Sequence, residues 1–220
     1  IVFKNVTFKY PAGNKNILNN VSFKISKGSR VGISGDSGSG KSTLLTLMLG
    51  LIQPDNGDVL FDNIKTYENF EKIKKNFGYV SQDVFLLDET IKYNVTLGLK
   101  EEDIDYQRLK EVFDISNLSS FVNSLADKEE TQIGEKALKI SGGQRQRLVL
   151  ARALYNKPEI IILDEATSEL DKKNELEIFE NILNKNKNKT MIIITHNKDL
   201  LNICNQIISI NGDKVVSTPN

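Results

Sequence analysis

Residues Gly35 to Ser42 constrain what this chain can fold into more than any other segment. They read Gly-Asp-Ser-Gly-Ser-Gly-Lys-Ser, which fits the phosphate-binding pattern Gly-x-x-x-x-Gly-Lys-Ser/Thr, and Thr43 follows. An apolar run, Val31 to Ile33, precedes this loop and a helical pattern follows it, so we expect a strand, the loop and a helix. Glycines let the backbone curl until its N–H groups point at phosphate oxygens. The sequence therefore predicts a nucleoside triphosphate site; the alternative is an incidental loop rich in Gly and Ser.

Two side chains of the loop have predicted roles of their own. The Lys41 ammonium neutralises charge on the β- and γ-phosphates, and the Ser42 hydroxyl is a ligand for Mg²⁺. The helix that begins here adds the partial positive charge of its N-terminus. The loop alone indicates a triphosphate without selecting a base or a reaction.

An acidic pair at the end of an apolar run narrows the prediction. Ile160 to Leu163 contains only Ile and Leu, which is typical of a strand buried on both faces of a parallel sheet. Asp164 and Glu165 follow, and two adjacent carboxylates at a strand end require solvent or a cation. Beside a phosphate-binding loop, Asp164 is predicted to hold Mg²⁺ and Glu165 to orient and deprotonate the attacking water. The alternative is a pair of surface acids that ends the strand.

Strand-like and helix-like segments alternate along the chain. Apolar or alternating runs predict strands at 21–25, 31–33, 77–80, 160–163, 191–194, 207–210 and 214–216. Helical patterns occupy residues 42–51, 144–156 and 174–183. Asn211-Gly212 predicts a hairpin turn between the last two strands. From about Asp83 to Ala137 helical segments dominate, for example 105–113. The alternation predicts an α/β fold with an inserted helical subdomain.

Charge and cysteine usage exclude some classes of partner and chemistry. Lys+Arg and Asp+Glu each number 29, so the net charge is zero and no overall basic field attracts nucleic acid. The single cysteine, Cys204, lies among apolar residues and is predicted to fill the core rather than act as a nucleophile. No apolar run approaches the roughly 18 to 20 residues that a membrane-spanning helix needs.

A third motif carries a family resemblance. Ile140 to Arg147 read Ile-Ser-Gly-Gly-Gln-Arg-Gln-Arg. This segment closely resembles LSGGQ, the signature of the ABC ATPases, with Ile for Leu at residue 140, a change that conserves volume. Together with the loop and the acidic strand, it makes the chain similar to the ABC ATPase family over essentially all 220 residues.

The resemblance implies a fold and a division of the chain. We expect a P-loop NTPase of the α/β class, with a RecA-like mixed sheet core, an N-terminal antiparallel β subdomain and an inserted helical subdomain. Residues 1–82 and 151–220 are expected to form the ATP-binding core. Residues 83–150 are expected to form the helical subdomain, which includes the signature.

The resemblance also implies individual roles. Tyr10 matches the aromatic residue that stacks on adenine, although an ordinary tyrosine at a strand end is the alternative. Gln82 matches the glutamine that senses Mg²⁺ and faces the membrane partner. His196, the only histidine, matches the switch residue that contacts the γ-phosphate. Ser168 to Asp171 resembles the SALD loop, with Glu replacing Ala.

A second copy of the chain is the expected partner. Ser141 and the N–H groups of Gly142 and Gly143 begin a helix, which makes a second anion-binding terminus on the same chain. The family places the two termini far apart, so the resemblance implies a head-to-tail pair that buries two ATP molecules and their Mg²⁺. The expected ATP contacts are Tyr10, Gly35, Asp36, Ser37, Gly38, Ser39, Gly40, Lys41, Ser42, Thr43, Ser141, Gly142, Gly143 and Gln144. The expected metal ligands are Ser42, Gln82 and Asp164, and the expected catalytic residues are Glu165, His196 and Gln82.

Besides transport, two other functions occur in proteins of this family: ATP binding without turnover, and action on DNA or ribosomes. A degenerate domain would bind ATP without turnover, but Glu165, His196 and both signature glycines are present, which favours hydrolysis. Soluble ABC ATPases that act on DNA or ribosomes carry a long coiled coil or a tandem domain. Gln82 and Ser141 are joined instead by a short region without sustained heptads.

Among transporters, the sequence resembles the exporter type. Thr131 to Lys136 resembles the TEVGE motif of exporters, and Tyr79 to Leu86 resembles their stretch around the glutamine, which would meet the coupling helices. The chain begins at Ile1 rather than Met, so we expect a fused membrane domain upstream and a location on the cytoplasmic face of the inner membrane. An importer subunit is the alternative. The chain is similar to bacterial flippases of lipid-linked oligosaccharides, while lipid A-like flippases and peptide exporters stay open.

Overall fold

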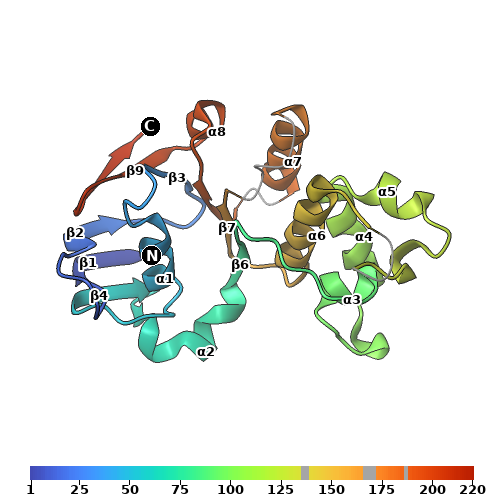
Figure 1. The fold of residues 1–220 in the computed structure, drawn as a ribbon, viewed down its shortest axis with the longest axis horizontal. Coiled ribbons are helices and arrows are strands. Elements are labelled where there is room, and N and C mark those ends of the chain that lie inside the picture. Colours follow the sequence, from blue (N-terminus) through green and yellow to red (C-terminus); the bar gives the residue numbers. More distant parts are fainter. Residues whose placement is uncertain (135–138, 166–171, 186–187) are drawn as a thin grey trace. The chain divides into compact units, whose positions relative to one another are not determined.

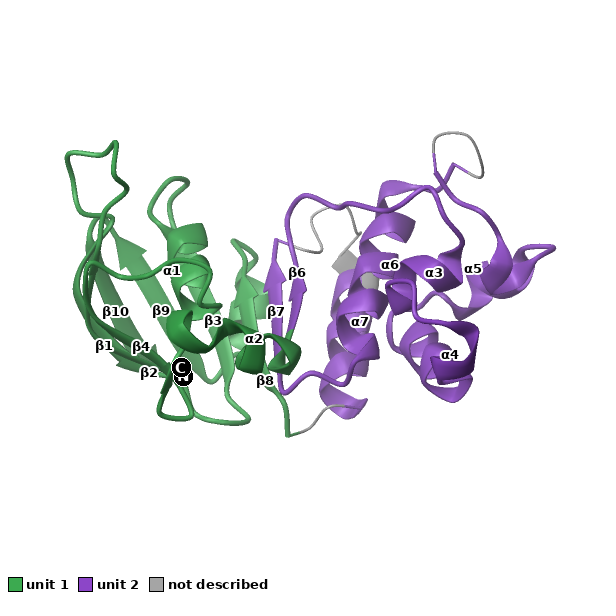
Figure 2. Ribbon diagram, turned by 90° about the horizontal axis from the view of Figure 1, so that it is seen from below, with its two compact units in different colours: residues 1–77, 188–220 green, residues 78–187 purple. Residues whose placement is uncertain are grey.

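The chain divides into two compact units. The computed structural model describes residues 1–134, 139–165, 172–185 and 188–220 of the 220-residue chain. Unit 1 consists of residues 1–77 and 188–220, and unit 2 of residues 78–187 (Figure 2). Among the described residues, no helix is both long and apolar enough to cross a membrane.

Unit 1 contains an antiparallel sheet near the N-terminus (Figure 1). Its strands, in spatial order, are β2 (Leu18–Lys24), β1 (Val2–Phe8), β4 (Asn56–Phe61) and β5 (Ile64–Lys65). Val21 and Phe23 of β2 are buried and alternate with exposed residues, and Phe23 stacks on Phe3 with 4.4 Å between the ring centroids. The period of two thus turns one face of the sheet into a hydrophobic layer. The antiparallel subdomain predicted from the sequence is confirmed.

A second sheet of unit 1 carries the phosphate-binding loop. β3 (Arg30–Gly35) pairs in parallel with both β8 (Thr190–Ile194) and β9 (Gln206–Asn211). β10 (Lys214–Pro219) returns antiparallel to β9, as the Asn211-Gly212 signal predicts. Every residue of β8 is buried, which explains its unbroken apolar run. The predicted mixed sheet is therefore confirmed.

The remaining elements of unit 1 are short. They are α1 (Lys41–Met48), η1 (Tyr67–Asn69), α2 (Phe70–Ile73), η2 (Lys74–Asn76) and α8 (Lys198–Asn202). The predicted helix over 42–51 is wrong at its C-terminal end, because α1 stops at Met48. Gly50 adopts a positive φ of 75°, and a Cβ there would lie 2.5 Å from the Thr66 carbonyl oxygen. The chain therefore leaves the helix at this glycine.

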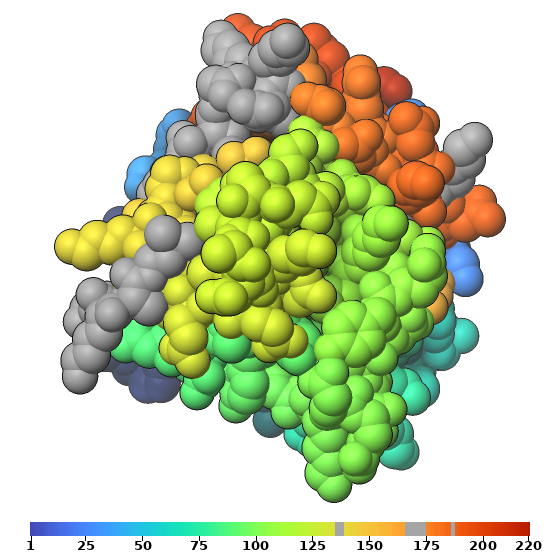
Figure 3. Space-filling model, turned by 90° about the vertical axis from the view of Figure 1, so that its right-hand side faces the viewer, coloured from blue at the N-terminus to red at the C-terminus, as the bar shows by residue number. Residues whose placement is uncertain are grey.

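Unit 2 combines two strands with a set of helices. β6 (Phe77–Val80) and β7 (Ile160–Asp164) are neighbours in a sheet. The helical elements are α3 (Ile91–Thr96), η3 (Glu101–Asp103), α4 (Tyr106–Ile115), α5 (Ser119–Ser124), η4 (Lys128–Glu130), α6 (Gly142–Tyr155) and α7 (Lys172–Lys185). Helices α3 and α4 pack on α6, and α4 and α5 form the green to yellow-green part of the surface in Figure 3. A predominantly helical segment between Asp83 and Ala137 was expected and is found in its described part.

The core of unit 2 forms around α6. Leu148, Ala151 and Leu154 are fully buried, and their spacing of three residues places them on one side of the helix. Helix α6 begins two residues before the predicted start at Gln144, because its cap is Ser141. Helix α7 is likewise longer than the predicted 174–183.

Candidate functional site

The loop between β3 and α1 has a backbone that only glycine adopts easily. Gly38 and Gly40 have φ angles of 76° and 102°, in the left-handed region. Gly40 is also the N-cap of α1, and a Cβ there would lie 2.7 Å from Cγ2 of Ile17. Conformation and close approach therefore both require glycine at residue 40. The result is a tight loop that leads directly into a helix N-terminus.

The polar groups of this loop suit an anion. The Lys41 ammonium donates to the carbonyl oxygens of Gly35 at 2.7 Å and Asp36 at 2.9 Å, so it lies over the loop. The first turn of α1 carries no acidic residue, so its N-terminal partial charge is not offset there. The Ser39 hydroxyl is buried and has no hydrogen-bond partner in the part of the chain that the structure describes. A cation, a helix terminus and an unpartnered hydroxyl together fit a phosphate group.

Two further predicted residues lie with this loop in unit 1. The Tyr10 hydroxyl and the Thr43 hydroxyl are 3.2 Å apart, and the Tyr10 ring is 45% exposed. An exposed aromatic face beside a phosphate loop can stack on a base. His196 follows β8 and is exposed. Because β3 and β8 are parallel neighbours in register, the loop and His196 leave the sheet at the same edge.

In unit 2, the acidic pair ends β7 with unusual geometry. Asp164 is 8% exposed, and the Tyr79 hydroxyl donates to its Oδ2 atom at 3.1 Å. Burial, followed by the charge of Asp164, raises the pKa of Tyr79 above its ordinary value. Glu165 has a φ of 48°, which is unfavourable for a residue other than glycine. Backbone strain of this kind is concentrated at functional sites.

The signature segment begins α6 with a complete cap. The Ser141 hydroxyl accepts from the Gln144 N–H at 3.2 Å, and the Gln144 side chain accepts from the Ser141 N–H at 2.8 Å. This capping box leaves Gly142 and Gly143 in the first turn, with their N–H groups outside the helical hydrogen-bond ladder. Ser141 is exposed. The segment is therefore a second helix N-terminus open to an anion.

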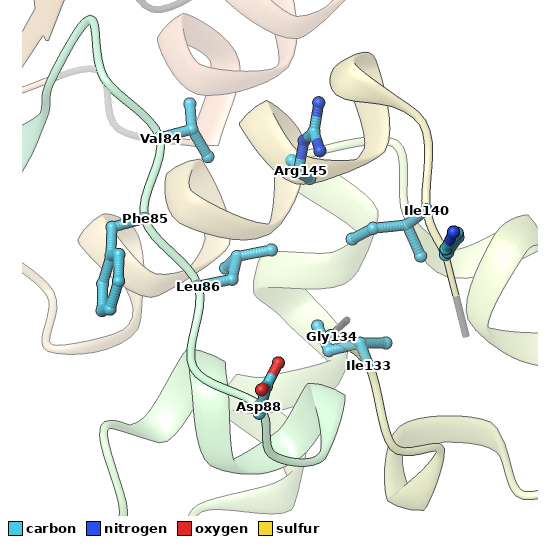
Figure 4. A pocket seen from close by; sticks show the side chains of 9 residues that line it. Val84, Phe85, Leu86, Asp88, Ile133, Gly134, Ile140 and Arg145 are labelled. Atoms are coloured by element: carbon cyan, nitrogen blue, oxygen red, sulfur yellow. The ribbon is translucent and has the colours of Figure 1, made fainter. Parts of the chain in front are cut away.

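Gln82 is exposed directly after β6, and the strap that follows it, residues 84–89, borders a cavity. The cavity has a volume of about 420 Å³, and its lining includes Leu86, Ile140 and Arg145 (Figure 4). Figure 4 shows Leu86 pointing toward Ile140, with Phe85 on the other side of the strap. The Phe85 side chain is 70% exposed.

A buried polar network fixes the shape of this strap. Asn94 is fully buried; its side chain donates to the Leu87 carbonyl at 3.0 Å and accepts from the Leu87 N–H at 2.9 Å. The Arg152 guanidinium donates to the carbonyl oxygens of Phe85 and Asn94, both at 2.8 Å. Burial lowers the pKa of Arg152. The strap is therefore tied to helices α3 and α6 by its main chain.

A profile of the ABC transporter family matches residues 18–168. The chain belongs to the ABC transporter family. It is an ATP-binding domain of that family, an ABC ATPase, as its signature segment indicates.

Relatives of this ABC ATPase are exporters. Over 219 residues it is 40% identical to a Rickettsia typhi protein named as an export ATP-binding/permease protein, covering 99% of this chain and 38% of the relative. It is 35% identical to the ATP-dependent lipid A-core flippase of Bordetella avium, over 98% of this chain and 36% of the flippase. The solved structure of a bacterial Atm1-family ABC exporter with ATP bound matches with a TM-score of 0.89 and 30% identity, over 98% of this chain and 38% of that one. The chain thus spans little more than a third of these relatives.

The structure separates the predicted ABC site residues into two groups. Unit 1 holds Tyr10, the residues of the phosphate loop and His196, and unit 2 holds Gln82, the signature, Asp164 and Glu165. The SALD-like residues Ser168 to Asp171 lie outside the described residues, as do Glu135 and Lys136 of the TEVGE-like segment.

Two residues of this ABC domain had no role in the sequence prediction. Tyr79 appeared there only as the first residue of the segment Tyr79 to Leu86, which resembles exporters. Burial alternates along β6, so Tyr79 lies on the opposite face of the strand from Gly78 and Val80. The link from Arg152 to the strap spans 67 residues to Phe85. A local sequence pattern carries no signal for such a distant partner.

Proposed function

We propose that this chain is the motor domain of an exporter, and that two copies close around two ATP molecules. The observation that carries the proposal is the presence on one chain of two helix N-termini that suit an anion: the phosphate loop before α1 and the capped signature before α6. In a head-to-tail pair each signature completes the phosphate site of the other copy. The similarity of the chain to exporters supports this arrangement.

Each proposed ATP contact has a chemical reason. The Tyr10 ring stacks on adenine, and the N–H groups of the loop with the Lys41 ammonium bind the phosphates. The second copy adds Ser141 and the N–H groups of its first helical turn. The full proposed set is Tyr10, Gly35, Asp36, Ser37, Gly38, Ser39, Gly40, Lys41, Ser42 and Thr43 of one copy, with Ser141, Gly142, Gly143 and Gln144 of the other.

The donor set suits Mg²⁺. Ser42, Gln82 and Asp164 offer hydroxyl, amide and carboxylate oxygens, which this hard cation prefers, and it commonly keeps several waters besides one or two carboxylates. Among the described residues, no group of three or more His, Cys, Asp and Glu side chains gathers as a richer metal site. When bound, Mg²⁺ neutralises charge on the β- and γ-phosphates.

Three residues have different roles in the proposed hydrolysis. Glu165 accepts a proton from water as the water oxygen bonds to the γ-phosphorus and the bond to the β–γ bridging oxygen breaks. His196 holds the γ-phosphate in the closed geometry, and Gln82 orients the water and links the site to the membrane partner. The strained backbone of Glu165 supports its assignment.

The proposed membrane domain, location and cargo are suggested by the relatives. Their names combine ATP-binding with permease, or describe a flippase of lipid A-core. We propose that a membrane domain is attached to this chain, that it lies in the inner membrane with this domain on the cytoplasmic face, and that a lipid-linked oligosaccharide is the cargo. Residues 1–82 and 151–220 would act as the ATP-binding core and residues 83–150 as the helical subdomain, and the region around Gln82 to Thr90 would meet the membrane domain.

The substitution Glu165→Gln tests the proposal. It keeps the side-chain length but removes the base, so we expect the ATPase rate to fall at least about 100-fold while the Kd for ATP stays within about 3-fold. The matched control is Glu180→Gln on the exposed face of α7, which should leave both quantities unchanged. A Glu165→Gln protein that hydrolyses ATP at the wild-type rate contradicts the assignment of Glu165.

A further inference from the structure

Tyr79 occupies an unusual place in β6. Its neighbours Gly78 and Val80 are buried, whereas the Tyr79 side chain points to the other face of the strand and stays 39% exposed. The ring is therefore not a main component of the hydrophobic core. Its hydroxyl reaches across to the neighbouring strand β7 and donates to Oδ2 of Asp164 at 3.1 Å.

This hydrogen bond occupies one of the two oxygens of a functional carboxylate. A tyrosine hydroxyl is protonated at neutral pH, so it is a steady donor to an ionised carboxylate. Asp164 is largely buried, and its torsional freedom is restricted by the bond at Oδ2.

We propose that Tyr79 is a positioning residue for the magnesium site: its hydroxyl donates to Oδ2 of Asp164 and thereby fixes the orientation of the carboxylate that would bind the ion or its water. The inference rests on the proposed role of Asp164 as a magnesium ligand. Groups that hydrogen-bond to metal ligands orient those ligands, and their loss typically lowers metal affinity by about 10- to 100-fold. Tyr79 is placed for this task by the pairing of β6 with β7.

The test measures how much Mg²⁺ strengthens nucleotide binding, without turnover. The Kd for the non-hydrolysable analogue AMP-PNP is determined in saturating Mg²⁺ and in EDTA, and the ratio of the two values reports the contribution of the ion. For Tyr79→Phe we expect the Kd in EDTA to stay within about 2-fold of wild type, and the ratio to fall about 10- to 100-fold. The ATPase should need more Mg²⁺ for half-maximal rate and recover most of its kcat when Mg²⁺ saturates.

Tyr93→Phe is the matched control. Tyr93 lies in α3 of the same unit and is 40% exposed, and no hydrogen bond of its hydroxyl occurs within the described part of the chain. Loss of this hydroxyl should leave both Kd values unchanged. Melting temperatures of both variants should lie close to that of wild type, because phenylalanine keeps the ring in place.

Asp164→Asn separates the two ways in which the idea can fail. If wild type gains nothing from Mg²⁺, or if Asp164→Asn keeps the wild-type ratio, then the metal assignment of Asp164 is wrong and the inference falls with it. If the ratio of the two Kd values falls in Asp164→Asn but stays at or above the wild-type value in Tyr79→Phe, only the positioning role of Tyr79 is wrong.

Discussion

The Lys41 ammonium lies over the phosphate loop because two carbonyl oxygens of that loop, those of Gly35 and Asp36, accept its hydrogen bonds. These carbonyls hold the cation where a nucleotide phosphate is proposed to bind. A hydrogen bond between an ammonium and a phosphate joins opposite charges, so it is shorter and stronger than one between neutral groups.

We predict that Lys41→Met weakens ATP binding at least 10-fold, since a hydrogen bond to a charged group contributes about 1.5–3 kcal/mol. Isothermal titration calorimetry of the variant measures the change. Lys110→Met, on the exposed side of α4, is the control and should bind ATP as wild type does. Equal affinities for the two variants would contradict the role of Lys41.

Cys204 illustrates a residue whose sequence prediction needed only its neighbours. It is 4% exposed, its Sγ atom faces the Leu200 carbonyl oxygen at 3.4 Å, and burial raises its pKa to about 11. The prediction of a core position is confirmed. Tyr79, by contrast, depends on a partner 85 residues away, which no spacing in the sequence reveals.

At the scale of elements, the cap of α6 joins stability with the proposed chemistry. Replacing the Ser141 hydroxyl by a methyl group removes the bond to the Gln144 N–H, so Ser141→Ala should lower the free energy of unfolding by about 1 kcal/mol. Urea denaturation measures this change.

Ser141→Asp distinguishes the cap from the proposed contact with phosphate. Aspartate is as good an N-cap as serine, so the free energy of unfolding should stay close to wild type. Its negative charge would face the γ-phosphate of the other copy, so ATPase activity should fall at least 10-fold. An active Ser141→Asp variant would argue against the head-to-tail arrangement.

Element boundaries were harder to predict than element types. The sequence indicated α1 and α6 correctly, but their ends depend on a glycine at residue 50 and on the capping box of Ser141. Strand β4 had no prediction of its own, because Asn56, Gly57 and Asp58 do not resemble a strand. Gly57 has a φ of 78°, and a Cβ there would lie 2.3 Å from the Lys4 carbonyl oxygen. Such close approach to another strand has no local signature.

For the molecule as a whole, alternation of strands and helices was enough to predict the α/β class, and the fold is confirmed by its match to an exporter. The proposed site could be assembled from the sequence because its contiguous motifs, the loop and the signature, each lead into a helix N-terminus, which suits an anion. Roles that depend on a second copy of the chain are not encoded by any one of these motifs.

We predict that the chain is a monomer without nucleotide and a dimer when Glu165→Gln is saturated with ATP and Mg²⁺. The reason is that the proposed interface is largely filled by ATP, so the nucleotide links the two copies. Sedimentation velocity measures the change in mass. Lys41→Met should stay a monomer under the same conditions, and a tight dimer of the wild type without nucleotide would contradict the proposal.

Helix α6 carries the signature glycines at its beginning and Arg152 near its end. At 1.5 Å per residue, Gly142 and Arg152 lie about 15 Å apart along the helix axis. Arg152 donates to the Phe85 carbonyl oxygen in the strap and to the Asn94 carbonyl oxygen in α3, so a displacement at the start of α6 is passed on to the strap and to α3. Any step that shifts the signature by an ångström must either move the strap with it or break these hydrogen bonds.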